Sequence, residues 1–207
     1  MIHYNANDLT KQQQYKMISG SIVPRPIAWV TTLSKDGSVV NAAPFSFFSA
    51  ASNELPLITV AILRKSGQIK DSARNILHRK EAVIHIVDTE VVEDMNQTSA
   101  PLPPDKSEID RTKLSLTNSK TVSVPAIQEA KIRFEGNLHQ YVPVTDDNGT
   151  VVSDLFILRV TDFYFDETVF DSTQEYILTE QLNPVARLAG ANYATLNEEF
   201  QLERPTE

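Results

Sequence analysis

The sequence predicts a mainly β protein, an antiparallel barrel that is closed or nearly closed, with added helices. Segments with strand character outnumber helical ones, and tight turns such as Asp36-Gly37 join several of them. A chain of 207 residues with 41% apolar and 22% charged content can form one domain with a sizeable core. A doubly wound parallel sheet would show strands alternating regularly with helices, so the antiparallel barrel is favoured.

The N-terminal part of the chain predicts a β-hairpin, preceded by a short helix or turn and an extended segment. Polar residues 8–19 predict a short helix or turn, and residues 21–26 are expected to be extended because Pro24 and Pro26 each push the residue before them out of the helical region. Residues 27–33 predict a strand, residues 34–37 a turn, and residues 38–43 a returning strand. This hairpin brings the threonines of the first strand close to the asparagine and alanines of the second: Thr31, Thr32, Asn41, Ala42 and Ala43.

The rest of the chain adds strands and two helices. A helix is predicted to begin at Asp71 as its N-cap, and residues 89–98 predict a second short helix. Residues 99–119 are the longest irregular stretch, and long loops in compact domains are usually functional or mobile. Further strands are predicted at residues 57–63, 81–87, 132–142, 151–160 and 161–170.

Composition excludes several classes of function. The net charge is −8 and no basic cluster is present, so a duplex nucleic-acid binder is not expected. The chain has no cysteine, which excludes disulfides and thiolate chemistry, and its four histidines lack metal-ligand spacing. No metal site, catalytic acid–base pair or Rossmann glycine motif is identified. Met1 leads into polar residues, and no apolar run approaches a membrane span, so a cytoplasmic protein is expected.

The least ordinary stretch is Asn41-Ala-Ala-Pro-Phe-Ser-Phe-Phe48. Pro44 removes a ladder donor and is expected to break regular pairing, while small Ala42 and Ala43 would let a planar ring approach the main chain. Ser46 could donate to a phosphate, and the flanking phenylalanines could exclude water. A strand that runs into a loop with buried aromatic side chains explains the same stretch without any ligand.

A second polar cluster surrounds the start of the helix at Asp71. Lys70 supplies a full charge and Ser72 a hydroxyl, beside the free N–H groups of a helix N-terminus, which suit a phosphate. A capped surface helix with solvated cations explains the cluster equally well, because cap signatures are common.

Taken together, these stretches resemble the flavin reductase-like family of FMN-binding split barrels. The resemblance rests on residues 25–32, 41–48, 70–76, 95–99 and 184–190 followed by Tyr193, and it covers about residues 15–200. Two positions depart from the family pattern, with Ser72 where threonine is more usual and Ala189 where glycine is common.

The resemblance implies a six-stranded antiparallel Greek-key split barrel with flanking helices in a single domain, residues 1–207. It also implies a homodimer with FMN in a groove near the dimer interface. Two groups of residues would bind FMN. Those expected beside the ring and ribityl chain are Thr31, Thr32, Asn41, Ala42, Ala43, Phe45 and Phe47. Those expected at the phosphate are Ser46, Lys70 and Ser72. Arg187 is expected either on the cofactor or in a subunit salt bridge, and Arg25 is expected to be structural.

The resemblance further implies hydride transfer from NAD(P)H to FMN, with electrons passed onward to a partner such as a monooxygenase. No ionisable catalytic side chain is required, because the redox chemistry belongs to the cofactor. Two alternatives remain open: a flavoredoxin-like FMN carrier that does not use nicotinamide, and a flavin-binding module without turnover. A related split-barrel class oxidises pyridoxamine phosphate, but the stretch 41–48 fits the flavin reductase group better.

Overall fold

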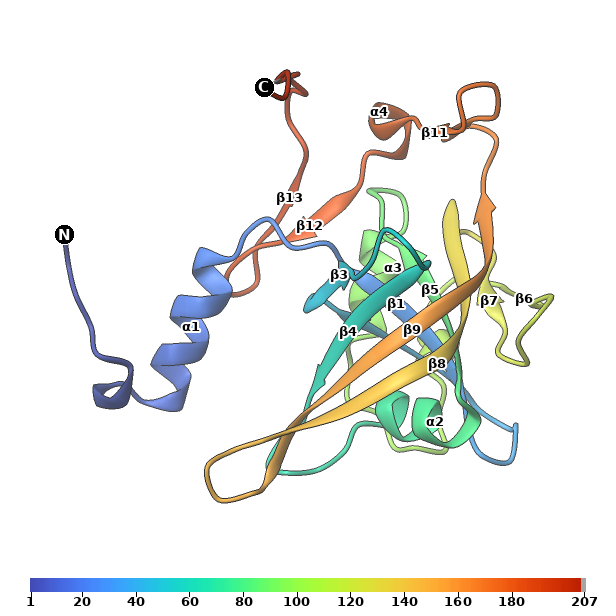
Figure 1. Cartoon of the computed structure of the whole chain (residues 1–207). Helices are drawn as coiled ribbons and strands as arrows, with labels where there is room; N and C mark the ends of the chain where they lie inside the picture. The colour runs from blue at the N-terminus through green and yellow to red at the C-terminus, as the bar shows by residue number, and fades with distance from the viewer. Residues whose placement is uncertain (206–207) are drawn as a thin grey trace.

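A seven-stranded antiparallel sheet dominates the computed structural model, which describes residues 1–205. Its strand order is β2-β1-β5-β8-β9-β4-β3, and it curls into a barrel (Figure 1). The strands are β1 (Ala28–Leu33), β2 (Val40–Phe45), β3 (Phe48–Ala50), β4 (Leu57–Leu63), β5 (Glu81–Ile86), β8 (Ile132–Thr145) and β9 (Val151–Phe165). The predicted antiparallel barrel is confirmed. The sheet has seven strands where six were expected, because the short β3 pairs with β4 as a strand of its own.

The sheet curls because its two edge strands are neighbours in the chain. β2 and β3 lie at opposite ends of the strand order, yet only Ser46 and Phe47 connect them. Two residues span only about 7 Å, so the sheet must bend until its edges meet. The carbonyl of Phe47 accepts the N–H of Ala61, which fastens this connection to β4 at 2.8 Å. We call residues 46–47 and the ends of β2 and β3 beside them the seam.

Shorter elements surround the barrel. The helices are α1 (Lys11–Ser21), α2 (Asp71–Arg79), α3 (Val92–Gln97) and α4 (Thr179–Leu182), with 3-10 turns η1 (Ala6–Asp8) and η2 (Glu108–Arg111). Three two-stranded ladders are β6 (Leu116–Thr117) with β7 (Ala126–Ile127), β10 (Phe170–Asp171) with β11 (Tyr176–Ile177), and β12 (Val185–Arg187) with β13 (Tyr193–Thr195). α2 lies at one end of the barrel, whereas α1 stands away from it (Figure 1). Among residues 1–205 no helix is long and apolar enough to cross a membrane.

Strand alternation divides the core into two layers. Side chains that point into the barrel form one cluster, which includes Val30, Val60 and Phe156 and is closed by Ile76 of α2. The opposite face of β1 carries Trp29 into a second cluster with Met95 and Ile127. Because β1 is buried on both faces, all six of its residues are buried, and polar side chains on β1 must find internal partners.

Two predicted strand boundaries were wrong. Pro44 does not break β2, which continues to Phe45, because β2 is an edge strand and its proline needs no partner on the open side. Residues 161–170 are not a separate strand: Thr161 to Phe165 continue β9, and only Phe170–Asp171 form β10. β9 is long because it pairs with β8 on one side and β4 on the other.

Candidate functional site

Two hollows meet at the seam. One has a volume of about 240 Å³ and is lined by Phe45, Ser46 and Arg187 together with Met95 and Tyr193. The other, of about 460 Å³, shares Ser46 and is lined by Phe47, Phe48 and apolar residues near the end of α1. Phe45, Ser46 and Phe47 of the stretch 41–48 and Arg187 of the stretch 184–190 therefore lie around one place in the fold.

Arg187 reaches this place from the C-terminal ladder. It lies on β12, opposite Tyr193 of β13, and its guanidinium lies over the tyrosine ring at 4.5 Å. The Tyr193 hydroxyl lies 3.3 Å from Asn96 Oδ1. This stacking holds a cation against the hollow that Phe45 and Ser46 line.

Arg25 is a buried residue that links the seam to neighbouring segments. It is 6% exposed, and its guanidinium donates to the carbonyls of Ser19, Ile22 and Leu188. Its Nε also lies 3.4 Å from Ser46 Oγ. Since three carbonyls already hold the guanidinium, Arg25 ties the end of α1 and the C-terminal segment to the seam, as expected for a structural residue.

The N-terminus of α2 lies beside the same aromatic stretch. Lys70 Nζ is 5.6 Å from the centroid of the Phe45 ring. Partial burial of the ammonium group and the nearby charge of Lys65 lower the pKa of Lys70, and none of the ion pairs within residues 1–205 includes it. A cation that is partly desolvated and has no acidic partner would be stabilised by a bound anion.

Asp71 does not cap α2 as predicted. Lys70 occupies the N-cap position in extended conformation and makes no side-chain cap hydrogen bond, while the carboxylate of Asp71 pairs with Arg74. The first N–H groups of α2 therefore lack a side-chain acceptor, and such groups carry the positive end of the helix dipole. The chemistry of this end fits a phosphate better than the predicted cap would have allowed.

A buried polar network joins β2 to α2. Asn41 Oδ1 accepts from Ser72 Oγ at 2.7 Å and lies 3.4 Å from Thr32 Oγ1. Asn75 Nδ2 donates to Thr32 Oγ1 at 3.1 Å, and Asn41 Nδ2 donates to Glu108 Oε2 at 2.7 Å. The predicted residues Thr32, Asn41 and Ser72 are thus in contact, and the Ser72 hydroxyl is turned inward, toward Asn41.

The side chains of two predicted residues, Thr31 and Ala42, point away from α2. Thr31 is fully buried and donates to the carbonyl of Pro125, and the Ala42 side chain packs in the cluster of Trp29 and Met95. Strand alternation places these side chains on the face opposite Thr32 and Asn41. Only the main chain of Thr31 and Ala42 could contact a ligand on the α2 side, whereas Ala43 faces that side beside Phe45.

Glu108 and Asn75 belong to this site but were not singled out from the sequence. Asn75 lies within the stretch 70–76, on which the family resemblance partly rests, so the motif could have identified it. Glu108 lay in the irregular stretch 99–119, where no periodicity or motif distinguishes one carboxylate from another. Within residues 1–205, no group of three His, Cys, Asp or Glu side chains could hold a metal ion.

The curled antiparallel barrel defines a split-barrel protein, with two hollows at its seam and an uncapped helix start at α2. A family model described as "Flavin reductase like domain" matches residues 19–181. The chain therefore belongs to the flavin reductase-like family, as its motifs predicted.

Three relatives extend this result. The Bacillus subtilis (strain 168) protein YwrF is 47% identical over 206 residues, covering 100% of both chains. The crystal structure of nitrilotriacetate monooxygenase component B from Bacillus cereus has a TM-score of 0.94 and 42% identity, covering 98% of both chains. The structure of Pseudomonas fluorescens 2-nitrobenzoate 2-nitroreductase NbaA has a TM-score of 0.88 and 30% identity, covering 99% of this chain and 97% of that chain.

Proposed function

We propose that this protein is an FMN-dependent oxidoreductase of the flavin reductase type. It takes a hydride from NAD(P)H onto FMN and passes electrons onward, to a monooxygenase partner. The observation that carries the proposal is the position of Lys70, 5.6 Å from the Phe45 ring at the uncapped start of α2, in no ion pair with any of residues 1–205. A charged end beside an aromatic wall matches the two ends of FMN, a phosphate and a flat ring.

The phosphate end would be held by Lys70 and the first turn of α2. Lys70 belongs to no ion pair within residues 1–205, the first turn of α2 has no side-chain cap, and helix N-termini are ready-made anion sites. Ser46 Oγ is available from the seam, since its contact with Arg25 is long at 3.4 Å. Thr32 and Asn41 would not contact the phosphate; they would position Ser72 through the hydrogen-bond network.

The ring end would lie along the seam. Bound FMN would supply the redox chemistry itself. Phe45 and Phe47 would wall the hollows and exclude water, and Ala43 leaves room for close approach to the main chain. Arg187 lines the hollow, and its guanidinium would stabilise negative charge at the ring edge. No side chain has to exchange a proton, so the site needs no ionisable catalytic residue.

Two further parts of the proposal concern partners. The likeness to a monooxygenase component B at 42% identity supports electron delivery to a monooxygenase. A homodimer is supported by α1, which stands away from the barrel and exposes Tyr15, Met17 and Ile18. A second copy that covered these apolar side chains would also close the seam, because Ile18 lines the larger of its two hollows.

One experiment tests the proposed activity. Purified protein with added FMN should oxidise NADH or NADPH at a rate far above that of free flavin without protein. If FMN binds tightly but neither nucleotide is consumed, the reductase proposal is wrong. Reduction of the bound FMN by a partner protein would then favour the flavoredoxin-like carrier over a flavin-binding module without turnover. If FMN does not bind at all, the proposed function is wrong.

A second experiment tests the site. Ser46→Ala combined with Lys70→Ala should weaken FMN binding by about tenfold or more for each lost charge-assisted hydrogen bond, since each contributes about 1.5–3 kcal/mol. Fluorescence titration of FMN measures the change. The matched control is Ser172→Ala combined with Lys113→Ala, two exposed residues outside both hollows. Equal affinity in the test and control variants would show that the phosphate lies elsewhere.

A further inference from the structure

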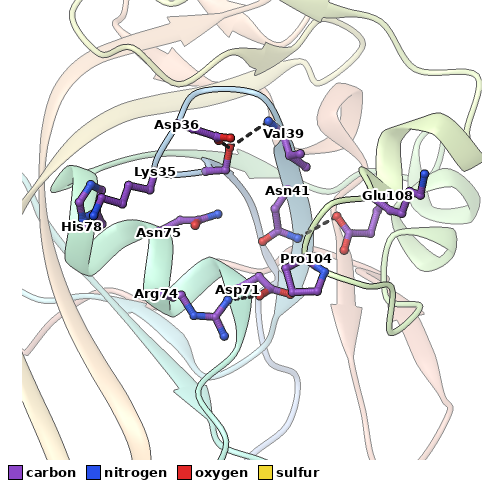
Figure 2. A pocket seen from close by; sticks show the side chains of 12 residues that line it. Lys35, Asp36, Val39, Asn41, Asp71, Arg74, Asn75, His78, Pro104 and Glu108 are labelled. Carbon is purple, nitrogen blue, oxygen red and sulfur yellow. Dashed lines mark hydrogen bonds and ion pairs between the residues drawn. The ribbon is translucent and has the colours of Figure 1, made fainter.

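The carboxylate of Glu108 lies against the edge of the barrel, on the wall of a cavity of about 600 Å³ (Figure 2). It comes from η2, is 6% exposed, and directs a single oxygen at two donors. Its Oε2 accepts from Asn41 Nδ2 at 2.7 Å and from the N–H of Ala42 at 3.0 Å. Hydrogen bonds from two donors to one buried carboxylate oxygen are among the stronger kinds in proteins.

This contact decides which way round the Asn41 amide lies. Asn41 Nδ2 faces Glu108, so Oδ1 faces α2 and accepts from the hydroxyl of Ser72 at 2.7 Å. A reversed amide would turn Oδ1 toward the carboxylate and Nδ2 toward Ser72. The reversed amide would place Oδ1 against the carboxylate oxygen of Glu108, and these two acceptors would repel each other. Glu108 therefore selects the orientation that holds Ser72.

Through Ser72 the contact reaches the start of α2. Ser72 is 2% exposed and is the second residue of that helix, directly after Asp71 and the N-cap Lys70. Its side-chain hydrogen bond to Asn41 pulls the first turn of α2 against β2. The chain Glu108–Asn41–Ser72 thus links the irregular stretch 99–119 to the helix end with unoccupied N–H groups.

We propose that Glu108 is a positioning residue for the phosphate end of the FMN site. It acts through Asn41 and Ser72, and it fixes where the first turn of α2 presents its N–H groups and Lys70. This inference rests on the proposed function, since it names the residue that prepares the same site. Glu108 itself contacts β2 and does not need to contact the cofactor.

The test compares Glu108→Ala with Glu108→Gln in the full-length chain. Both donors go to one oxygen, so the glutamine Oε1 can still accept both, whereas alanine accepts neither. We expect Glu108→Ala to weaken FMN binding by about tenfold, equivalent to about 1.4 kcal/mol, and Glu108→Gln to restore it to within about twofold. Equal losses in both variants, or no loss in Glu108→Ala, would overturn the proposal.

A double-mutant cycle with Ser72→Ala tests the route of the effect. If Glu108 acts through Asn41 on Ser72, the losses in FMN affinity from Glu108→Ala and Ser72→Ala should not add. Additive losses would overturn the relay. Glu129→Ala is the matched control: Glu129 also anchors the 99–119 stretch, through the N–H of Ser115, but makes none of the contacts to β2. It should leave FMN affinity unchanged.

One readout needs no flavin, so it separates failure of this inference from failure of the proposed function. In the protein without FMN, the side-chain NH₂ of Asn41 should be protected from hydrogen exchange in the wild type and in Glu108→Gln. It should exchange at least tenfold faster in Glu108→Ala. Protection that persists in Glu108→Ala would show that Glu108 does not hold the amide, whatever the flavin titration shows.

Discussion

His85 makes the stability of this protein depend on pH in a window that its surroundings define. The ring is fully buried on β5, behind Trp29. Ile127 donates its N–H to Nε2 at 2.9 Å, so Nε2 carries no proton, and Nδ1 lies 2.8 Å from the carbonyl of Trp29, to which it must donate. Both nitrogens are satisfied only in the neutral ring. Protonation would turn Nε2–H toward the N–H of Ile127.

The size of the effect follows from the pKa of His85. Burial lowers it from 6.5 to about 4, the hydrogen bond to Trp29 opposes this change, and the charge of Arg133 adds to it. The unfolded chain therefore binds a proton between about pH 6.5 and pH 4 that the folded protein does not. Stability contributed by the neutral ring is present above pH 6.5 and is lost as pH falls. The loss between pH 7 and pH 4 is about 3 kcal/mol, from about 1.4 kcal/mol per pKa unit.

Urea denaturation of the wild type and of His85→Gln across pH 4 to 7 measures this loss. The free energy of unfolding of the wild type should fall by about 3 kcal/mol more than that of His85→Gln, because the glutamine at position 85 does not titrate. His139→Gln, at an exposed histidine, should follow the wild type. Parallel curves for wild type and His85→Gln, or an NMR titration of His85 near pH 6.5, would show that burial of His85 does not cause this loss.

Two other outcomes are expected. Asp154→Ala should lower the urea midpoint, because it removes a fully buried carboxylate that accepts from Arg64 Nε at 2.9 Å and Nη2 at 2.8 Å and leaves the guanidinium without its partner; an unchanged midpoint would contradict this. Limited proteolysis within residues 99–119 should lower FMN retention, because it releases the segment that carries Glu108 from the edge of β2; nicked protein that keeps its FMN would count against a role for this segment.

Local patterns in the sequence were sufficient for the regular elements. Alternation and turn residues predicted β1, β4 and the hairpin into β2, and β4 spans the predicted residues 57–63. Periodicity placed α2, whose Ala73 and Ile76 enter the barrel core. These signals act over a few residues, because backbone conformation and the burial of one face depend mainly on near neighbours. The motifs also pointed to the family that the domain match then showed.

Local residue patterns are therefore enough to predict the mainly β antiparallel class, the family and the residues that meet at the seam. Which side chains of each strand face α2 depends on how distant parts of the chain pack together. It turned Thr31 to the face opposite Thr32, and it let Pro44 remain inside an edge strand. It also brought Glu108 to Asn41 across 67 positions of the chain. Contacts of this kind depend on how the sheet closes, and no short stretch of residues carries that information.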